Sequence, residues 1–211
     1  MTRPAKIDRL SRQAKAKSAK RSRRKEELAD AALVTLRQLG YARTSLRDIA
    51  EQSDVSVGTL HYYFEDKADL IAFCVRRYKT GFVEDLDAIL RRDETPQVLA
   101  EQLSKRLGLA IQREAEAHRL WYDIRTQSMF DPAFAEAVAE IEAALIAVTE
   151  RLVTRLGRPA DEGLATYLLL DSAFRYYLQR CLAGDGQAVA QFCAHVLAQL
   201  QPQGAMEPLP G

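Results

Sequence analysis

Residues 55–67 read Val55-Ser56-Val57-Gly58-Thr59-Leu60-His61-Tyr62-Tyr63-Phe64-Glu65-Asp66-Lys67, and this stretch decides the fold. Ser56 is a good helix N-cap, and Leu60 and Phe64 lie four residues apart, on one face of a short helix. Gly58 costs such a helix about 1 kcal/mol relative to alanine, which makes sense where the backbone must approach another group closely, such as a phosphate. The pattern predicts a helix over 57–64 that carries three residues on its other faces: Thr59, His61 and Tyr62.

Two helices are predicted before this stretch. Apolar residues recur at helical spacing over 25–39, and Gly40 is a typical helix stop. Ser45 and Asp48 form a Ser-x-x-Asp capping box for a second helix, which ends near Gln52 and is followed by a tight turn over 53–55. With the helix over 57–64, these two helices can bury a small core made of Leu36, Ile49, Val55, Leu60 and Phe64.

A long helix and five later helices are predicted after this stretch. Asp66 caps an apolar-periodic run to about Leu90, which spans roughly 37 Å at 1.5 Å per residue and is long enough to belong to two domains. Proline after a capping residue and glycine after an apolar run mark the further helices, over 96–116, 118–128, 132–156, 159–182 and 185–200. No stretch alternates with period two, so we expect an all-α fold of about nine helices.

Charge is distributed unevenly along the chain. Residues 1–25 hold eleven of the 30 basic residues and one of the 29 acidic residues, which leaves 19 basic and 28 acidic residues, a net charge of −9, for the rest. We expect residues 1–24 to be a disordered basic arm and the Pro/Gly-rich residues 202–211 to be a disordered tail. The arm is either a solubilising tail or a segment that neutralises DNA phosphates or enters a groove.

Several classes of protein are disfavoured by what the sequence lacks. No apolar run reaches the roughly 18 residues of a membrane span, and no apolar segment follows the basic N-terminus as a secretory signal requires. The three cysteines include no CxxC pair, which fits a reducing cytoplasm. Metal-ligand spacings, phosphate loops and nucleophile motifs are missing. We therefore expect a cytoplasmic protein that is no enzyme and uses neither a metal nor a cofactor.

Residues 28–70 resemble the DNA-binding domain of the TetR family of bacterial transcriptional regulators. The resemblance rests on Thr44-Ser45-Leu46-Arg47-Asp48-Ile49-Ala50, on residues 55–64, and on Lys67-Ala68-Asp69-Leu70. Many members show Gly-x-Leu-Tyr-x-Tyr/His-Phe-x-x-Lys-x-x-Leu, and this chain departs from it at His61, where tyrosine is commonest. The resemblance implies a helix-turn-helix DNA-binding domain over 25–70 and a helical ligand-binding and dimerisation domain over 71–201.

Carried over by resemblance, individual residues acquire roles in binding double-stranded DNA. Ser45 is expected to contact a phosphate, and Arg47 a base edge or a phosphate. Thr59, His61 and Tyr62 are expected to face the major groove, while Tyr63 and Lys67 hold the DNA backbone. Ser56, Val57 and Gly58, at the start of the recognition helix, complete the set. There are alternatives to these roles. Tyr62 and Tyr63 could pack against the long helix, and His61 could be a core residue.

The C-terminal half carries two further expectations. By resemblance, the last two helices, 159–182 and 185–200, form the interface of a homodimer, and their apolar stripes are wider than one partner helix needs. An apolar cavity among the middle helices would bind a small-molecule effector. The residues expected to line it are Phe82, Trp121, Arg125, Met129, Tyr167 and Phe174. The alternative is an ordinary core, and His118 and Asp123 are interpreted as surface residues.

These expectations lead to one preferred function. It is a TetR-like transcriptional regulator, most simply a repressor released from a palindromic operator by a small-molecule ligand. The alternative is a ligand-independent, architectural DNA-binding dimer that uses the basic N-terminal arm.

Overall fold

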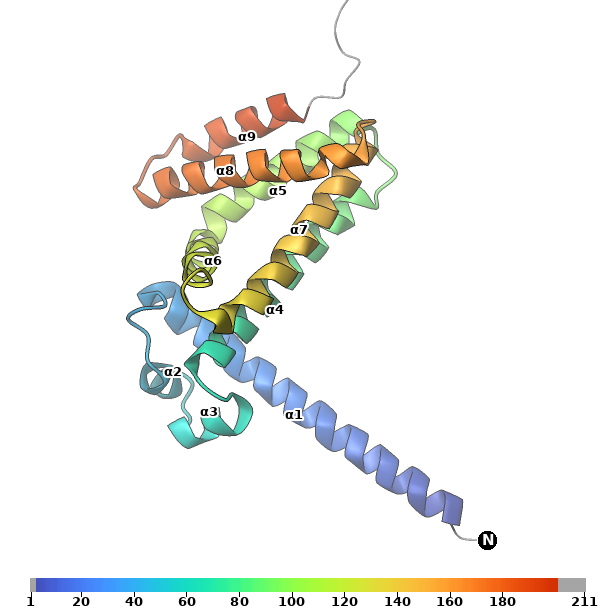
Figure 1. The fold of residues 1–211 in the computed structure, drawn as a ribbon, viewed down its shortest axis with the longest axis vertical. Coiled ribbons are helices and arrows are strands. Elements are labelled where there is room, and N and C mark those ends of the chain that lie inside the picture. Colours follow the sequence, from blue (N-terminus) through green and yellow to red (C-terminus); the bar gives the residue numbers. More distant parts are fainter. Residues whose placement is uncertain (1–2, 201–211) are drawn as a thin grey trace, which may run out of the picture. The chain divides into compact units, whose positions relative to one another are not determined.

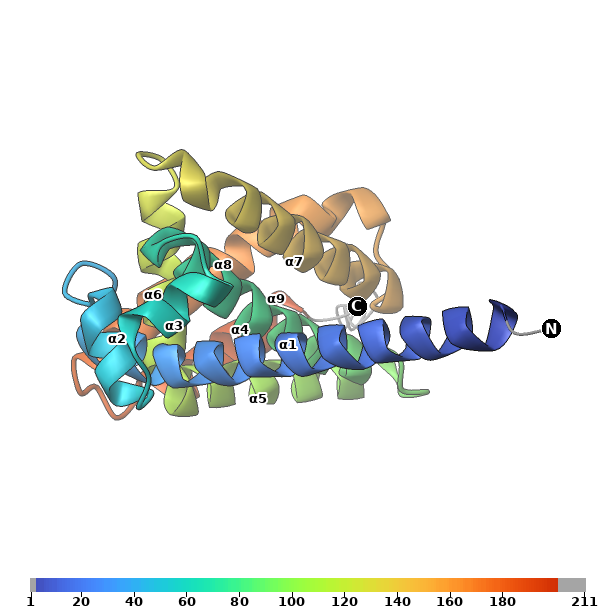
Figure 2. The same ribbon diagram turned by 90° about the horizontal axis from the view of Figure 1, so that it is seen from below.

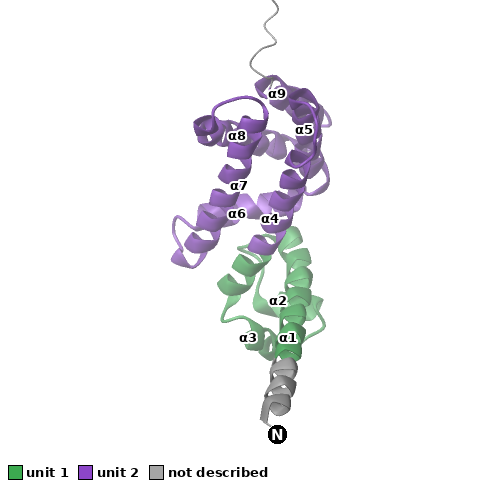
Figure 3. Ribbon diagram, turned by 90° about the vertical axis from the view of Figure 1, so that its right-hand side faces the viewer, with its two compact units in different colours: residues 1–74 green, residues 75–211 purple. Residues whose placement is uncertain are grey.

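The computed structural model describes residues 3–200, with side chains from Lys15 onward, and its regular elements within that range are all helical (Figure 1). Nine α-helices and two short 3-10 helices occur there, which confirms the all-α prediction. The chain divides into two compact units, residues 1–74 and 75–211 (Figure 3). The division falls inside one helix, a few residues beyond the boundary at 70/71 that the sequence predicted.

The first unit is a small helical domain. It contains α1 (Arg3–Leu39), α2 (Leu46–Gln52), α3 (Val57–Tyr63) and the first residues of α4 (Lys67–Leu90). Its core holds four of the five residues that the sequence placed there, Leu36, Ile49, Leu60 and Phe64, which are almost completely buried. Val55 is only half-buried, because it lies in the turn between α2 and α3.

The turn between α2 and α3 has a left-handed residue at its centre. Asp54 has φ of +50°, a conformation that aspartate tolerates better than most residues. The backbone N–H of Val55 then donates to the carbonyl of Ala50 at 3.0 Å and closes the turn. This turn joins the two helices of a helix-turn-helix motif.

Helix α1 is longer than the sequence predicted. We expected disorder over residues 1–24, whereas α1 continues unbroken through the described residues 3–24 and forms one continuous helix (Figure 2). Alanine, lysine, arginine and glutamine are strong helix formers, and no glycine or proline follows Pro4 in this stretch. The ion pair between Arg24 and Glu27 (2.8 Å) links neighbouring turns. The tail expected over 202–211 lies outside the described residues.

The second unit contains the remainder of α4 and the later helices. These are α5 (Pro96–Arg113), α6 (Ala115–Gln127), η1 (Pro132–Phe134), α7 (Ala135–Arg155), η2 (Ala160–Glu162), α8 (Gly163–Leu182) and α9 (Ala188–Gln199). Helix α8 packs against α5, α7 and α9, and α5 packs against α9, so α8 lies at the centre of this unit (Figure 1). Gly163 permits close packing of α8 on α7, since an added Cβ would lie 2.8 Å from the Cα of Glu150.

The C-terminal end of α4 is held by α7. The Arg155 guanidinium donates to the carbonyl of Leu90 (2.7 Å), and also to the carbonyls of Arg92 (2.9 Å) and Glu94 (3.3 Å). One turn earlier, Arg151 forms an ion pair with Asp87 (2.8 Å). These bonds satisfy carbonyls that have no partner within α4 and fix this end of the helix to its neighbour.

Candidate functional site

The start of α2 is organised by the capping box that the sequence predicted. The Ser45 hydroxyl accepts the backbone N–H of Asp48 (3.2 Å) and donates to the Asp48 carboxylate (2.6 Å), and the Ser45 backbone N–H donates to the same carboxylate (2.7 Å). These hydrogen bonds lower the pKa of Asp48. The capping box does not use the backbone N–H groups of Leu46 and Arg47. These groups lie at the N-terminus of the helix, where a phosphate binds best.

Helix α3 presents its polar residues to solvent. The Ser56 hydroxyl caps it by accepting the backbone N–H of Thr59 (3.1 Å), and it lies 2.9 Å from the Thr59 hydroxyl. Ser56, Gly58 and His61 are exposed, whereas Val57 and Thr59 are half-buried. Because His61 is exposed, it is not a core residue, which was the alternative interpretation.

Among the described residues, no steric contact requires a glycine at position 58. A Cβ added there would meet only the Ser56 hydroxyl, at an ordinary contact distance of 3.7 Å. The residue is exposed on α3, where glycine weakens the helix. A backbone that approaches another molecule closely remains the explanation that fits.

Two aromatic rings and a lysine lie around the end of α3. Tyr62 is 63% exposed, its ring lies edge-on to that of Tyr63 (4.9 Å between centroids), and the Arg21 guanidinium lies 5.4 Å from its centroid. The Lys67 ammonium donates to the carbonyl of Tyr41 (2.8 Å) and lies 4.4 Å from that ring. Lys67 therefore ties the start of α4 to the connection between α1 and α2.

The predicted DNA-binding residues thus lie together on α2, α3 and the start of α4, all within the first unit. Helix α1 adds a set of exposed basic residues that the sequence placed in a disordered arm: Lys15, Lys17, Lys20, Arg21, Arg23 and Arg24. Positive charge along a helix of this unit fits a polyanionic partner.

The second unit contains an apolar cavity of about 70 Å³. Five helices contribute to its wall, α4 to α8. Four of the six residues predicted to bind an effector line it: Phe82, Trp121, Tyr167 and Phe174. The remaining wall is mostly leucine and valine, from positions 86, 103, 107, 145, 148, 152 and 170. Sequence periodicity identified the aromatic part of this wall because all four residues face inward from amphipathic helices.

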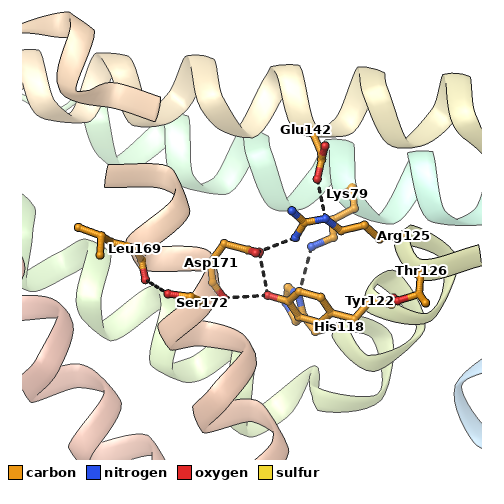
Figure 4. Close-up of polar contacts among 9 residues, drawn as sticks. All are labelled: Lys79, His118, Tyr122, Arg125, Thr126, Glu142, Leu169, Asp171 and Ser172. Carbon is orange, nitrogen blue, oxygen red and sulfur yellow. Dashed lines mark hydrogen bonds and ion pairs between the residues drawn. The ribbon is translucent and has the colours of Figure 1, made fainter. Parts of the chain in front are cut away.

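Met129 and Arg125 do not line this cavity. Met129 is 72% exposed, after the end of α6. The Arg125 guanidinium binds two carboxylates, Glu142 and Asp171, at 2.6 Å each, and the Tyr122 hydroxyl donates to the Asp171 carboxylate at 2.9 Å (Figure 4). Arg125 therefore joins α6 to α7 and α8.

The cation of the cavity is Lys79, which sequence reasoning missed. Its side chain is 3% exposed, and its ammonium lies 3.3 Å from His118 Nδ1 (Figure 4). His118 is 1% exposed, so its interpretation as a surface residue was wrong. The sequence did contain a usable pattern, because Lys79 follows Val75 by four residues and precedes Phe82 by three, which places it on the apolar face of α4.

Burial changes the acid–base properties of the residues around the cavity. It lowers the pKa of the Lys79 ammonium to about 7, because the charged form loses its hydration. Burial also raises the pKa of both Tyr122 and Tyr167, so both phenols keep their protons. The Tyr167 hydroxyl is buried with no hydrogen-bond partner among the residues that the structure describes.

The first unit matches the sequence model of a known family. Residues 28–73 match the family described as "Bacterial regulatory proteins, tetR family". The HTH-type transcriptional repressor KstR of Mycolicibacterium smegmatis is 34% identical over 95 residues, which cover 45% of this chain and 46% of that protein. The chain spans less than half the length of the curated relatives it matches.

Solved structures share the fold over most of the chain. A TetR transcription regulator from Haloarcula marismortui has a TM-score of 0.71 at 20% identity and covers 86% of this chain and all of its own. The transcriptional regulator FadR from Bacillus subtilis, in complex with stearoyl-CoA, has a TM-score of 0.67 at 17% identity, covering 85% and 98% of the two chains. At these identities the likeness concerns the fold.

The capped α2, the left-handed turn and the exposed α3 form a helix-turn-helix motif, an arrangement that many DNA-binding proteins use. Residues 28–73 match the tetR family of bacterial regulatory proteins, and the fold of the chain is that of solved TetR regulators. This match confirms the resemblance that residues 28–70 carry. No helix within residues 3–200 has both the length and the apolar character needed to cross a membrane.

Proposed function

We propose that this protein is a homodimeric transcriptional repressor that leaves its operator when a small molecule enters the cavity of the second unit. The observation that carries the proposal is α4. This helix begins with Lys67 beside the helix-turn-helix motif and continues to Lys79, Phe82 and Leu86, which line the cavity. One helix thus contributes residues to both units, and a ligand that favours one position of α4 would change the DNA affinity.

The DNA-binding part of the proposal assigns separate roles to α2 and α3. Arg47 and the free amides at the start of α2 would bind phosphates and position the protein. His61 and Tyr62 are exposed and would read base edges from the major groove. The match to KstR, a repressor by name, supports repression as the direction of control. The protein would act in the cytoplasm, where a bacterial operator is found.

Dimerisation is proposed through α8 and α9. Helix α8 exposes four large apolar residues, Leu164, Leu168, Leu169 and Tyr176, each more than half accessible. Such a surface on a helix that already packs on α5, α7 and α9 is typical of an interface between copies. A two-fold dimer would carry two α3 helices to successive major grooves of a palindrome, about 34–36 Å apart.

The experiment that tests this proposal is selection of binding sites from random DNA, followed by release of the selected site by small molecules. We expect a palindrome with half-sites about one helical turn apart. Binding that is indifferent to sequence would instead indicate the architectural alternative. A selected operator that no compound in a broad apolar library releases would contradict the control by an effector.

Substitutions of His61 and Lys67 distinguish recognition of bases from binding of the DNA backbone. His61→Ala should relax discrimination at one base position by about 1–3 kcal/mol. Lys67→Ala should weaken binding to all sequences alike and reduce the salt slope by about 1. Because Lys67 also binds the Tyr41 carbonyl, thermal melting must be measured with it. Equal effects of both substitutions on all sequences would contradict these roles.

A further inference from the structure

Lys79 is a buried residue of the second unit with hydrogen-bond donors that the described residues do not use. An ammonium has three N–H donors. Within residues 15–200, the hydrogen bond to His118 Nδ1 (3.3 Å) is the one polar contact it makes. The ring faces of Phe82 and Trp121 lie 5.0 and 4.9 Å away. Two N–H groups of the Lys79 ammonium therefore have no hydrogen-bond partner among these residues, and burying a charged group without a partner is costly.

The carboxylates around Lys79 are committed to other cations. Within the described part of the chain, none lies within ion-pair distance of its ammonium, and Glu84, on α4 itself, is exposed. The two carboxylates that act on Lys79 most strongly already bind arginines: Glu114 binds Arg106 (3.1 Å) and Asp171 binds Arg125 (2.6 Å). On α7, Glu140 binds Arg76 and Glu142 binds Arg125, at 2.6 Å each.

The same cavity has a second unused donor. Tyr167 lines it, is 7% exposed, and its hydroxyl has no hydrogen-bond partner among the described residues. The other phenol of the wall, Tyr122, is different because it donates to Asp171 (2.9 Å). Lys79 and Tyr167 therefore both offer N–H or O–H groups to whatever occupies the cavity.

The rest of the wall is mostly aliphatic and aromatic, and its other polar side chains, His118, Thr149 and Asp171, are hydrogen-bonded within the chain. The occupant is therefore expected to be apolar except at one end. That end must accept several hydrogen bonds and favour a cation nearby, and a carboxylate does both. We propose that the cavity binds a small apolar carboxylic acid as its anion, with the carboxylate oxygens accepting from Lys79 and Tyr167. The cavity of about 70 Å³ is small, so an acid with a short chain or a single ring is the one to test first.

This inference rests on the proposed effector site and names the chemical class of its ligand. The buried ammonium, with a pKa of about 7, is partly deprotonated at neutral pH. An arriving carboxylate favours its charged form, so binding is coupled to uptake of a proton. At pH 8 the uptake approaches about one proton per site, because the free ammonium is then mostly neutral.

The test compares acids with neutral amides of the same skeleton, phenylacetate with phenylacetamide and hexanoate with hexanamide. Calorimetry at pH 8 in two buffers of different ionisation enthalpy gives both the affinity and the proton uptake. We expect the acids to bind more tightly than the amides and to be alone in taking up a proton. Equal affinities, absent proton uptake, or no binding of either acid would overturn the assignment.

Variants locate the effect at Lys79. Lys79→Met should reduce acid affinity by at least about thirtyfold and abolish the proton uptake. Tyr167→Phe should reduce acid affinity by about tenfold. Lys105→Met, which removes an exposed lysine of α5, is the matched control and should change neither. An unchanged acid affinity in Lys79→Met, measured on protein with a cooperative melting transition, would also overturn the assignment.

Release of the operator separates this inference from the proposed function. Acids and amides that bind equally and both release the operator would reject the carboxylate and leave the effector-controlled repressor standing. Acids that bind with proton uptake but leave the operator bound would support the carboxylate site and reject the control by that ligand.

Discussion

At position 58, helix stability favours alanine, whereas the proposed DNA contact favours glycine. Its exposed position on α3 leaves room for a Cβ, so Gly58→Ala should raise the free energy of unfolding by about 1 kcal/mol. If the backbone here approaches a phosphate, the same methyl group should weaken operator binding by about tenfold or more. Urea denaturation and an operator titration measure the two quantities.

Gly81→Ala is the control for this substitution. Gly81 is an exposed residue of α4, and nothing lies within 4 Å of a Cβ built on it. It should stabilise the protein by a similar amount and leave DNA affinity unchanged. A Gly58→Ala protein with unaltered operator affinity would contradict a close backbone contact at this position.

Lys79 should give the protein a particular dependence of stability on pH. Its folded pKa of about 7 lies below the ordinary lysine value of 10.5, so between these two values the unfolded chain binds more protons and stability rises with pH. Lys79→Met removes this dependence and the buried charge. The variant should be the more stable protein at pH 7, and its advantage should shrink by up to about 1.4 kcal/mol per pH unit above pH 7.

Urea denaturation of both proteins at pH 7 and pH 9 measures this difference. The neighbouring ionisable groups, among them His118, Glu114, Arg125 and Asp171, are the same in both proteins, so their contributions cancel to first order. Lys105→Met should show no such change. A gap between wild type and Lys79→Met that is constant with pH would contradict the burial of a titrating ammonium.

At the scale of residues, the sequence predicted what depends on local geometry. The capping box of Ser45 and Asp48 is present, and Leu60 and Phe64 are buried as their spacing indicated. Lys79 and His118 were not anticipated, since their burial depends on how α4 and α6 pack against helices distant in sequence. Arg125 was expected in the cavity, and the acidic partners from α7 and α8 hold it elsewhere.

At the scale of elements, the close approach of α8 to α7 at Glu150 requires a glycine at position 163. An alanine at position 163 would place its methyl group 2.8 Å from the Cα of Glu150, and backbone atoms yield less easily than side chains. Gly163→Ala should therefore lower the free energy of unfolding by about 1–3 kcal/mol. Thermal melting and urea denaturation measure the loss.

Gly186→Ala is the matched control, because a Cβ at that position meets nothing within 4 Å. Its effect should stay within about 0.5 kcal/mol. If the two substitutions proved equally mild, the close packing of α8 on α7 would not be a requirement of the fold.

Three helix ends were predicted correctly. Helix α2 ends at Gln52, α4 at Leu90 and α8 at Leu182, as the sequence indicated. Helix α1 was predicted to start near residue 25, because its first part has no apolar stripe to bury. Intrinsic propensity decides such a solvated segment, and it favours a helix there.

At the scale of the whole molecule, the proposed dimer depends on the exposed face of α8. Leu168→Glu places a charge where a partner helix would pack, while the residue's 53% exposure leaves the single chain undisturbed. We expect a monomer by analytical ultracentrifugation, an unchanged helical content, and operator affinity lower by on the order of 100-fold.

Leu109→Glu, at a 39% exposed position of α5, serves as the control and should remain dimeric. A dimeric Leu168→Glu protein that binds the operator normally would place the interface elsewhere. The sequence alone could indicate an excess of apolar surface on α8, but the structure identifies which leucines α5, α7 and α9 leave uncovered.

The attachment of Arg155 to the carbonyls after α4 has a mechanical consequence. If α4 tilts about this fixed end, as the proposed control by an effector requires, it acts as a lever. Its 24 residues give it a length of about 36 Å, so a tilt of about 5° displaces Lys67 by about 3 Å. In the proposed mechanism, a ligand that displaces Lys79 or Phe82, part of the way along α4, would therefore move the opposite end of the helix most.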